Sequence, residues 1–521
     1  MSELSVPLRP WARADVRAQT AAESAAFDAR AIDETDVPEP VLMENAGRGA
    51  ASVLHRLWGD RPVVGLVGPG NNGGDALVVL RTLAAWGRQV VAVLVADRGA
   101  ADPLLHGWPL EIVRDGDLDG RGWDALWAAG PVVVDGILGT GARGAPRGRQ
   151  AAAIARVEAS GCPVLALDVP SGIDATTGAV PGAAIRADVT VSFGAPKLGS
   201  LLHPARSRVG RQVTLEIGFP PLSPRDADAL VVTPAWARAR LPLRDSDTHK
   251  NRVGRVLVVG GGVGMAGAAV LAARAAFRAG AGLVRVCTVE ENREIVQTAL
   301  PEAIWIAPAG AALDEAMAAS DAVALGPGLG RTAAARWVLE HVAAAGDGVP
   351  LVLDADALNL AAEGVVDLAS IAGRRPTLLT PHPGEMARLL GEDPPDRLDA
   401  LRTARERFRC TVLLKGAPSL TAAVSGPVLV DSQSSSDLAV AGMGDTLTGA
   451  VVALAAQGCA PELAGSLGLY LTGRAAALAN RGAGLAPSDV VERLPDALAE
   501  RGTARTDLEM PMVIFDADPA R

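Results

Sequence analysis

Residues 62–75 read PVVGLVGPGNNGGD and decide the fold of the first half of this chain. A short run of β-branched and apolar residues is typical of a buried parallel strand, and this run ends in a turn with four glycines. Glycines let the backbone approach a ligand closely, and a turn that opens onto a helix N-terminus favours an anion such as phosphate. The adjacent asparagines and the aspartate add directional amide and carboxylate groups. The stretch therefore predicts a strand, a ligand-binding turn and a helix.

The same alternation of strand and helix continues in both directions along the chain. Ala-rich helical stretches separate short apolar runs, which is typical of parallel sheets covered on both faces. The pattern predicts an α/β protein with two doubly wound domains. The strand candidates are residues 62–68, 89–95, 131–138, 162–170 and 188–194 in the first half, and residues 255–261, 283–289, 322–328, 350–356, 376–383 and 411–416 in the second.

The boundary between the two domains is expected near the middle of the chain. Residues 219–225 read FPPLSPR, and residues 233–248 add further breaks of Pro, Arg and Asp character, as in a linker. The last twenty residues contain Pro511, Pro519 and three aspartates, so we expect a loose tail. The predicted organisation is a first domain at 1–222, a linker at 223–248, a second domain at 249–503 and a tail at 504–521.

Composition excludes several classes of protein. The chain has 521 residues, 49% of them hydrophobic, so each domain is long enough to bury a full core. A net charge of −10 argues against nucleic acid and anionic membrane as partners. The longest uncharged stretch, residues 256–273, carries five glycines and is not typical of a membrane span. The four cysteines show no paired spacing, and no secretory signal is visible, so we expect a soluble cytoplasmic protein.

Lysine is scarce in this chain, and its few positions are candidates for function. The 49 basic residues include only Lys197, Lys250 and Lys415. A compact ammonium and a planar guanidinium are not interchangeable at tight sites. These three positions are therefore candidates for sites where the ammonium itself matters, and chance survival is the alternative.

Polar residues follow the other predicted strands of the first half. Asp135, Asp168, Ser171 and Lys197 all stand at or just after such strands. In open α/β sheets, ligands bind at the carboxyl ends of the strands, so these side chains are predicted to share a site with residues 71–75. For Asp135, a simple turn cap is the alternative.

Four ordered motifs of the first half resemble the NAD(P)H-hydrate epimerase domain, over residues 10–220. They are LMENAG at 42–47, NNGGD at 71–75, DGILGTGARG at 135–144 and DVPSG at 168–172. The resemblance implies a Rossmann-like three-layer sandwich that binds a potassium ion through Asn72, Asp135 and Ser171, and oxygen ligands suit such a hard cation. It also implies proton handling by Lys197 and Asp168 near C6 of the nicotinamide ring, where the R and S hydrates interconvert.

The implied hydrate-binding residues of the first half are Asn71, Asn72, Gly73, Gly74, Asp75, Gly139, Thr140, Gly141, Ala142, Arg143, Gly144, Ala145 and Asp168. This chain departs from the family at residue 76, where Ala stands in place of the usual glycine.

The second half contains a pattern that a dinucleotide dehydrogenase could also show. Residues 260–267 read GGGVGMAG between a predicted strand and helix, and Glu290 and Glu291 follow the next strand, as a ribose ligand would. The signal is weak alone, because the chain has 58 glycines. Five further motifs have no place in a dehydrogenase: GPGLG at 326–330, LDADALNL at 353–360, LTPHPGEMARLLG at 379–391, LLKGAPS at 413–419 and AGMGDTLTG at 441–449.

The last of these motifs is typical of phosphoryl transfer. A glycine turn that ends in Asp445 and opens a helix aims backbone N–H groups at one point, with a carboxylate beside them as base. Such a site suits transfer of a phosphoryl group to a hydroxyl. The alternative is that Asp445 is only a helix N-cap. Lys415 stands at a strand end where a nucleotide phosphate could bind, and His382 is held between two prolines.

These motifs resemble the ribokinase-like NAD(P)H-hydrate dehydratase, over residues 230–500. The resemblance implies ADP or ATP as co-substrate, with Mg²⁺ accompanying the nucleotide, and Asp445 as the catalytic residue. The implied nucleotide-binding residues are Lys415, Gly416, Ala417, Pro418, Ser419 and Gly444, and the implied hydrate-binding residues are Ala268, Gly328, Gly330, His382 and Asp445.

The chain departs from the dehydratase family in two places. KGAPS replaces the family's KGAGT, so Pro418 removes one backbone donor from the nucleotide loop. Residues 431–445 read DSQSSSDLAVAGMGD in place of an approach rich in glycine and asparagine. Both changes bear on nucleotide affinity and choice.

The two resemblances together imply a fused repair enzyme for nicotinamide nucleotides. Its first half would equilibrate the R and S hydrates of NADH and NADPH, and its second half would dehydrate the S form at the expense of an adenine nucleotide. A homo-oligomer is expected by analogy with the two families. The alternative is a ribokinase-like small-molecule kinase fused to a nucleotide-binding scaffold module.

Overall fold

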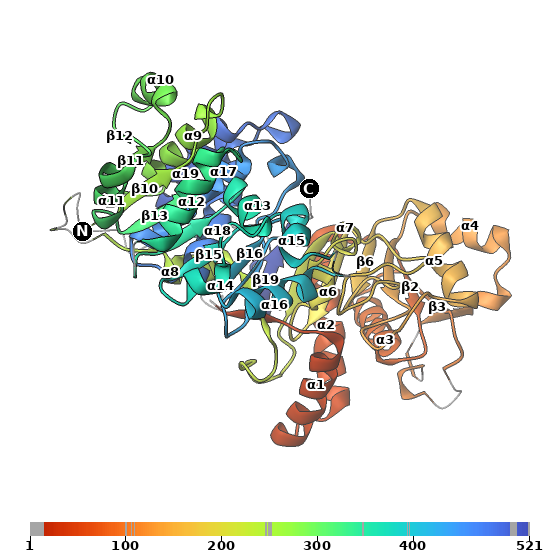
Figure 1. Cartoon of the computed structure of the whole chain (residues 1–521). Coiled ribbons are helices and arrows are strands. Elements are labelled where there is room, and N and C mark those ends of the chain that lie inside the picture. Colours follow the sequence, from red (N-terminus) through yellow and green to blue (C-terminus); the bar gives the residue numbers. More distant parts are fainter. Residues whose placement is uncertain are drawn as a thin grey trace. The chain divides into compact units, whose positions relative to one another are not determined.

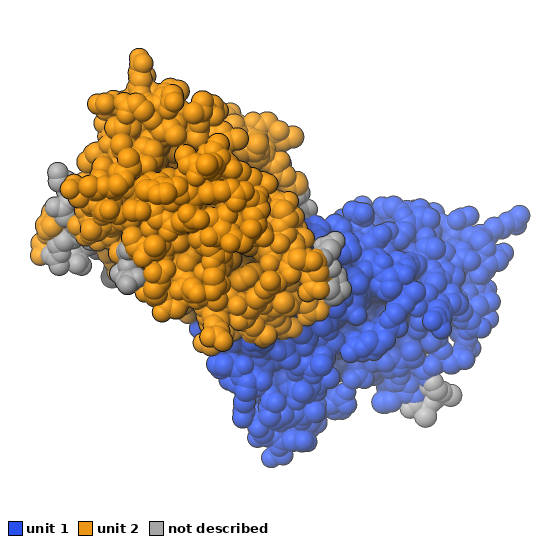
Figure 2. All heavy atoms as spheres, in the orientation of Figure 1, with its two compact units in different colours: residues 1–230, 504–520 blue, residues 231–503, 521 orange. Residues whose placement is uncertain are grey.

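The computed structural model describes residues 15–98, 102–105, 107–108, 110–244, 247, 249, 253–345, 348–392, 394, 396–500 and 508–518. The chain folds into two compact units, which Figure 2 distinguishes by colour. The first unit consists of residues 1–230 and 504–520, and the second of residues 231–503 and 521. Strands and helices alternate in both, so the prediction of two α/β domains is confirmed (Figure 1).

The first unit contains an eight-stranded sheet in the order β19-β8-β7-β6-β5-β2-β3-β4. All neighbouring strands are parallel except β19, which is antiparallel to β8. The chain runs from β2 outwards through β3 and β4, and then returns to β5 on the other side of β2. This reversal places a topological switch point between β2 and β5, where ligands of open α/β sheets bind.

The elements of the first unit are the strands β1 (Val16–Ala18), β2 (Val63–Val67), β3 (Val90–Leu94), β4 (Glu111–Arg114), β5 (Val132–Gly136), β6 (Val164–Leu167), β7 (Val189–Phe193), β8 (Arg211–Leu215) and β19 (Val513–Ala517), and the helices α1 (Ala21–Thr35), α2 (Glu39–Trp58), α3 (Asn71–Ala85), η1 (Pro103–Leu105), η2 (Asp115–Asp117), α4 (Gly120–Ala128), α5 (Gly148–Ser160), α6 (Leu198–Leu201) and α7 (Arg206–Val209).

Helices cover both faces of the centre of this sheet, which explains why the central strand β2 is apolar throughout. Along β2, Val63 and Val67 pack in a cluster with side chains of α2 and α3. Val64 and Leu66 point to the other face and pack with side chains of α4 and α5. Because successive side chains of a strand alternate between faces, a doubly covered strand reads as a continuous hydrophobic run. The unit is a three-layer α/β/α sandwich.

The second unit contains a larger sheet, whose strands run in the order β9-β18-β17-β16-β15-β14-β13-β10-β11-β12. The strands from β16 to β12 are parallel, and β17 lies antiparallel between β16 and β18. The chain reverses direction between β10 and β13, which is the switch point of this sheet. Helix α17 packs across β10 and β13 and against helix α9.

The elements of the second unit are the strands β9 (Ala229–Val232), β10 (Arg255–Val259), β11 (Leu283–Cys287), β12 (Ile304–Ile306), β13 (Ala322–Leu325), β14 (Leu351–Leu353), β15 (Thr377–Leu379), β16 (Thr411–Leu414), β17 (Leu420–Ala422) and β18 (Val428–Asp431), and the helices α8 (Pro234–Arg240), α9 (Ala266–Arg278), η3 (Glu290–Asn292), α10 (Arg293–Ala299), α11 (Gly310–Ala318), α12 (Ala333–Ala344), α13 (Asp356–Ala362), α14 (Leu368–Ala372), α15 (Pro383–Leu390), α16 (Arg397–Phe408), η4 (Ser436–Leu438), α17 (Met443–Ala456), α18 (Pro461–Ala479), η5 (Gly482–Gly484) and α19 (Pro487–Glu500).

The prediction of a loose C-terminal tail is wrong for the part of it that the structure describes. Residues 513–517 form β19, the edge strand of the first unit's sheet. Val513 and Phe515 are buried, and the carboxylate of Asp516 binds the guanidinium of Arg211 at 2.9 and 2.8 Å. The strand covers the backbone edge that β8 would otherwise expose. The proline and aspartate content of this segment suggested a loose tail. The sequence alone does not show that the segment can pair with β8 at the edge of the sheet.

The linker prediction is wrong for residues 229–240. This stretch contains β9, which joins the sheet, and the short helix α8. Trp236 of α8 is almost fully buried, and the hydroxyl of Thr233 caps the helix by accepting a hydrogen bond from the N–H of Trp236.

Among the described residues, no helix combines the length and the apolar character that crossing a membrane requires.

Candidate active sites

The first candidate site lies at the carboxyl ends of β2, β5, β6 and β7. The turns after β2 and β5 touch, because an added β-carbon at Gly68 would lie 1.9 Å from the carbonyl oxygen of Ile137. Only glycine permits so close an approach at this position. The two polar turns that the sequence analysis singled out therefore meet at the switch point.

Asp135 is the centre of the predicted ion site, and the structure buries it completely. Its carboxylate accepts hydrogen bonds from the hydroxyl of Ser171 at 2.6 Å, the N–H of Ser171 at 2.8 Å and the N–H of Ile137 at 3.2 Å. Burial raises the pKa of Asp135 to about 6, although the hydrogen bonds from Ser171 and Ile137 favour its ionised form. Asp135 is therefore more than a cap of its own turn, because it also binds the turn after β6.

Asn72 completes the predicted set of ion ligands. Its amide nitrogen donates to the carbonyl of Leu138 at 2.9 Å, and the N–H of Leu138 donates to the hydroxyl of Ser171 at 2.9 Å. The amide oxygen of Asn72 is buried and accepts no hydrogen bond from any described residue. A buried carbonyl oxygen without a partner is costly. A cation held by this oxygen and its carboxylate and hydroxyl neighbours would remove that cost, so these residues fit a potassium ion.

No cluster of three or more His, Cys, Asp or Glu side chains suited to a metal occurs within the described ranges.

Lys197 and Asp168, the predicted pair for proton handling, lie together in the structure. The Nζ atom of Lys197 is 2.9 Å from Oδ1 of Asp168 and also donates to the carbonyls of Phe193 and Ala195, at 3.1 Å each. Lys197 is 2% exposed, so its ammonium is almost completely withdrawn from water. Asp168 has a positive φ of 62°, a strained backbone that is found most often at functional sites.

Three further carboxylates, Asp28, Asp75 and Glu39, belong to the same electrostatic network as this ion pair, and the sequence analysis missed two of them, Asp28 and Glu39. Burial raises the pKa of Asp28 on α1 to about 6, with Lys197 opposing and Asp168 and Glu39 adding to the shift. Burial and the charges of Asp168 and Glu39 also hold the pKa of Asp75 well above its usual range. Asp28 lies on α1, outside every quoted motif, and Glu39 begins α2 three residues before LMENAG, so neither residue stood in a motif.

The predicted hydrate-binding loop after β5 reaches the same place. An added β-carbon at Gly139 would lie 3.2 Å from the β-carbon of Asn72, so the loop starts against the ion site. Its remaining residues, Thr140, Gly141, Ala142, Arg143, Gly144 and Ala145, are exposed or half-buried and open to a ligand.

Ala76, which stands where the epimerase family usually has glycine, is accommodated by Gly136 on β5. An added β-carbon at Gly136 would lie 2.5 Å from the β-carbon of Ala76, so glycine at position 136 leaves room for the extra methyl.

The second candidate site is centred on Lys415, directly after β16. Its Nζ atom lies 2.7 Å from Oδ1 of Asp354 and 3.8 Å from Oε2 of Glu385. Burial alone would lower the pKa of this lysine, but the charges of Asp354, Glu385 and Asp445 outweigh it and raise the pKa above its usual value. Lys415 is therefore a protonated cation in a ring of carboxylates.

Asp445 stands in the first turn of α17, beside Lys415. Burial and the charge of Asp354 raise its pKa to about 7, with Lys415 opposing, so a proton can be taken up or released near neutrality. The N-cap of α17 is Gly442, with a φ of 87°, and no side chain caps this helix. The alternative that Asp445 is only a helix cap is therefore wrong.

The start of α17 offers fewer free N–H groups than the motif suggested. The N–H groups of Met443 and Asp445 donate to the carbonyls of Val440 and Gly442 within the turn. The N–H of Gly444 makes no hydrogen bond to any described residue. An added β-carbon at Gly444 would lie 3.5 Å from Nζ of Lys415, so this N–H and the ammonium belong to one site.

His382 has a structural role that the sequence analysis left open. It is the N-cap of α15, and its Nδ1 accepts from the N–H groups of Gly384 at 3.1 Å and Glu385 at 3.3 Å. Glu385 completes a capping box by accepting from the N–H of His382 at 2.8 Å. The imidazole is half exposed, so its free edge can also contact a ligand.

The other predicted hydrate-binding residues lie on the turn after β13 and at the start of α9. An added β-carbon at Gly328 would lie 2.9 Å from the β-carbon of Ala268, so these two residues touch. The N–H of Gly330 donates to Asp356 at 2.8 Å, and the charge of Asp356 acts on Asp445. This chain of contacts connects all three positions to the edge that carries Asp445.

The nucleotide loop after β16 is closed by its own serine. The hydroxyl of Ser419 donates to the carbonyl of Gly416 at 2.9 Å and accepts from its N–H at 3.2 Å. Pro418 is buried, whereas Ala417 is exposed. Arg397 on α16, which the sequence analysis missed, donates to the carbonyl of Lys415 at 3.1 Å and supports the loop from behind its backbone.

The dehydrogenase alternative is contradicted by the contacts of the glycine turn after β10. The N–H groups of Gly261 and Gly262 donate to the carbonyls of Pro327 and Gly328 at 2.9 and 2.6 Å, so they are not available for a pyrophosphate. Two side chains from beyond β11 reach this turn: the hydroxyl of Thr288 and the amide of Asn292 both donate to the carbonyl of Gly261, the amide at 2.6 Å.

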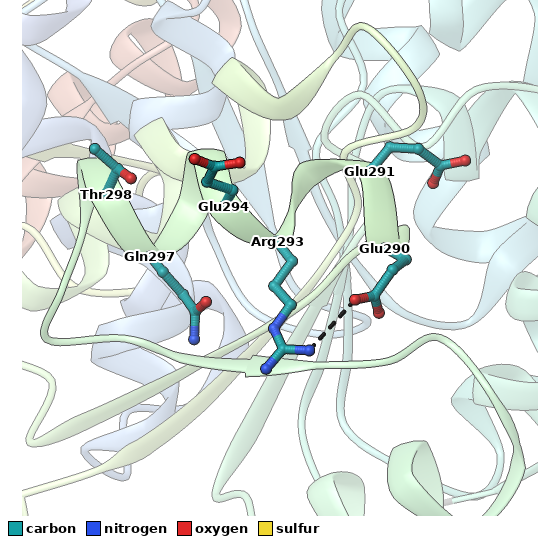
Figure 3. Close-up of a pocket in the computed structure, with 6 residues that line it drawn as sticks. All are labelled: Glu290, Glu291, Arg293, Glu294, Gln297 and Thr298. Carbon is teal, nitrogen blue, oxygen red and sulfur yellow. Dashed lines mark hydrogen bonds and ion pairs between the residues drawn. The ribbon is translucent and has the colours of Figure 1, made fainter.

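The acidic residues of the dehydrogenase alternative lie at the surface instead. Glu290 pairs with Arg293 at 3.3 Å, and Figure 3 shows both on one turn of the chain. They line an open surface hollow of about 520 Å³ whose residues are Glu290, Glu291, Arg293, Glu294, Gln297 and Thr298. Lys250, the third lysine, lies outside the described residues.

Comparison with known proteins assigns a family to each half. The family described as YjeF-related protein N-terminus matches residues 39–199, and the family described as NAD(P)H-hydrate dehydratase matches residues 256–496. Three relatives from different organisms are each named bifunctional NAD(P)H-hydrate repair enzyme. The chain is 39% identical to that of Moorella thermoacetica over 518 residues, which cover 92% of this chain and 96% of the relative.

The other two relatives match over a similar length. Identity to the enzyme of Salinibacter ruber is 37%, covering 92% of this chain and 96% of the relative. Identity to the enzyme of Escherichia coli is 34%, covering 91% and 90%. Among solved structures, an ADP/ATP-dependent NAD(P)H-hydrate dehydratase from Bacillus subtilis, co-crystallised with ATP and Mg²⁺, is 29% identical and covers 52% of this chain and 97% of its own, with a TM-score of 0.45.

Proposed function

Because the chain belongs to the family of bifunctional NAD(P)H-hydrate repair enzymes, we propose that it restores NADH and NADPH from their hydrates in two steps. The first unit is the epimerase, which interconverts the R and S hydrates. The second unit is the dehydratase, which removes water from the S form at the expense of ADP or ATP. Joining both activities in one chain makes every hydrate molecule repairable.

In the epimerase unit, Lys197 and Asp168 exchange protons with the substrate near C6. Their charged atoms are 2.9 Å apart and mostly withdrawn from water, which strengthens their effect on a bound hydrate. The residues 71–75 and 139–145 bind the nucleotide, with its phosphates at the start of α3. A potassium ion held by Asn72, Asp135 and Ser171 would supply positive charge beside these phosphates.

In the dehydratase unit, Lys415 and the N–H of Gly444 hold the phosphate of the nucleotide. Asp445 removes the proton of the C6 hydroxyl while the oxygen of that hydroxyl attacks the terminal phosphorus of the nucleotide. The bond between this phosphorus and the bridging oxygen of the nucleotide breaks at the same time. ADP thus becomes AMP, or ATP becomes ADP. Inorganic phosphate then leaves from C6 as C5 loses a proton, which restores the ring double bond. The observation that carries this proposal is geometric: the Nζ atom of Lys415 would lie 3.5 Å from a β-carbon added at Gly444, the residue directly before Asp445 in the first turn of α17.

The test is repair of a mixed hydrate preparation by the purified full chain. With ADP or ATP and Mg²⁺, we expect the near-ultraviolet absorbance of the reduced nicotinamide ring to return for both epimers. A stable phosphorylated product instead of NADH would favour a small-molecule kinase, and no reaction with either nucleotide would refute the proposal.

We also propose a cytoplasmic enzyme that assembles as a homo-oligomer. All four cysteines are free, as expected in a reducing compartment. Light scattering on the purified chain tests the assembly, and a monomer would contradict it.

Mg²⁺ is proposed to accompany the nucleotide phosphates, without an assigned protein ligand.

A further inference from the structure

Asp354 touches both parts of the dehydratase site, although no motif assigned it a role. It directly follows β14 and is 1% exposed. Its Oδ1 lies 2.7 Å from Nζ of Lys415, and its Oδ2 accepts a hydrogen bond from the hydroxyl of Thr448 at 2.6 Å. The hydroxyl of Thr448 is also 2.9 Å from the carbonyl of Gly444, in the turn that carries Asp445. One carboxylate therefore connects the ammonium to the start of α17.

We propose that Asp354 is a positioning residue of the dehydratase site, which fixes the Lys415 ammonium with one oxygen and, through Thr448, the turn of Asp445 with the other. This inference rests on the proposed function of the second unit. Lysine side chains are long and flexible, so an ammonium that binds a phosphate gains from being held in place before the nucleotide arrives. A buried carboxylate that accepts from both sides fixes the distance between the phosphate-binding cation and the catalytic base.

The charges around the site make the proposal measurable through pH. Lys415 faces Asp354, Glu385 and Asp445, whose charges all favour its protonated form. Asp445 faces Asp354 and Asp356, which favour its neutral form, and Lys415, which favours its ionised form. His382 adds a further charge near Glu385 when it is protonated. Removing the charge of Asp354 should thus lower the pKa of both Lys415 and Asp445.

The experiment compares Asp354→Asn with Thr448→Val in the full chain. For Asp354→Asn, we expect kcat of dehydration to fall by roughly 10²-fold because the reacting groups are misplaced. We also expect two changes in pH dependence. The acidic limb of the pH profile of kcat, which reports Asp445, and the alkaline limb of the pH profile of ADP binding, which reports Lys415, should both move to lower pH. Thr448→Val keeps the carboxylate charge and loses only the hydrogen bond, so kcat should fall while both limbs stay in place.

Several outcomes would overturn the proposal. If Asp354→Asn lowers the melting temperature but leaves kcat and both limbs unchanged, Asp354 is a structural residue only. If Asp354→Asn does not fold, Thr448→Ser and Thr448→Val decide the question. Serine keeps the hydroxyl, so the proposal requires kcat to survive in Thr448→Ser and to fall in Thr448→Val, and equal values would refute it.

Failure of the proposed function is distinguishable from failure of this inference. If the wild-type chain does not dehydrate any hydrate, the proposed function is lost. Binding of ADP can still be measured by calorimetry, and its alkaline limb must still move in Asp354→Asn if Asp354 positions Lys415. An unmoved limb would refute the role of Asp354 whatever the reaction is.

Discussion

Each unit contains a lysine, buried in the first unit and half-buried in the second, that pairs with an aspartate directly after a parallel strand. Lys197 meets Asp168 at 2.9 Å in the first unit, and Lys415 meets Asp354 at 2.7 Å in the second. Arginine serves nearly everywhere else in this chain as the basic residue. A compact ammonium fits where a planar guanidinium does not, which explains why lysine remains at these two positions.

The first prediction concerns Asp445 as the base of dehydration. Its ionised form must accept the proton, and its pKa is about 7, so kcat should fall as pH decreases below about 7. Asp445→Asn should lower kcat by at least roughly 10²-fold and abolish this acidic limb. Epimer exchange, measured by following the ratio of the R and S hydrates, should be unchanged.

The matched control for Asp445 is Asp314→Asn, since Asp314 is an exposed carboxylate of the same unit that pairs with His341. It should retain dehydration and its pH profile. If Asp445→Asn abolishes both epimer exchange and dehydration, the two sites are not independent and the assignment is wrong.

A second prediction concerns the ammonium of Lys197. Lys197→Arg preserves the positive charge, but Lys197 is 2% exposed, so a larger planar group must displace its packed neighbours. We expect epimer exchange to fall by at least about tenfold, with dehydration of pure S hydrate unchanged. Arg208→Lys, at a more exposed ion pair of the same unit, is the control. Full epimerase activity in Lys197→Arg would show that the ammonium is not specifically required.

At the scale of elements, α15 shows how a helix cap and a ligand contact can share one residue. His382 caps this helix through Nδ1 and leaves its other edge half exposed. His382→Asn should preserve the cap, because asparagine is also a preferred N-cap residue, whereas His382→Ala should cost about 1 kcal/mol of stability. We expect both variants to raise KM for the hydrate.

The two variants of His382 are compared by thermal melting and by steady-state kinetics. An unchanged KM in His382→Asn, with lower stability in His382→Ala alone, would assign His382 a capping role only.

The C-terminal strand β19 is an element whose loss should affect only the first unit. A chain shortened to residues 1–507 loses Leu508, Val513 and Phe515, all buried. At about 1.5–3 kcal/mol for each such side chain, the first unit should lose roughly 5 kcal/mol of stability. Calorimetry should show a lower melting temperature for that unit and loss of epimer exchange, whereas dehydration persists.

The control for this truncation is Glu509→Gln, which changes an exposed side chain of the same segment. Its melting profile should match that of the full chain. If the shortened chain also retains the original profile, β19 does not stabilise the sheet.

At the scale of the whole molecule, each unit carries its site at the carboxyl ends of its parallel strands, at the topological switch point in the first unit and from the switch point to the end of β16 in the second. In the first unit the chain reverses between β2 and β5, and in the second between β10 and β13. Loops after neighbouring strands diverge at such a point, which opens a crevice at the carboxyl edge of the sheet. Two similar architectures thus present two different sets of side chains to the same class of substrate.

This arrangement predicts that potassium acts on the first unit alone. A ligand that binds only the native form raises its melting temperature, so KCl should stabilise the first unit more than NaCl at equal ionic strength. Asp135→Asn should abolish the difference, whereas Asp124→Asn, at an exposed position on α4, should retain it. Equal melting temperatures of the first unit in both salts for the wild-type chain would contradict the ion site.

ADP should instead raise the melting temperature of the second unit.

Most of the fold was predictable because its signals are local. Buried strands of a doubly covered sheet are continuously apolar, and glycine turns mark their ends, so the strands that carry the sites were found from the sequence. The sequence also indicated that Lys197, Asp168, Asp135, Ser171 and Asp445 stand near strand ends or helix starts, and the structure has them there, whereas their roles stay predictions. Residue type and position along the chain determine these features.

The tertiary structure alone decided which distant segments meet. The charge of Asp28 on α1 interacts with those of Lys197 and Asp168 after β7 and β6, and residues 513–517 return to a sheet whose neighbouring strand ends at Leu215. Asp354 stood in a quoted motif, but its contacts with Lys415 and Thr448 join three separate elements. Charge and hydrogen bonding act across space, so a sequence shows the groups that can interact, and only the packed chain shows which of them do.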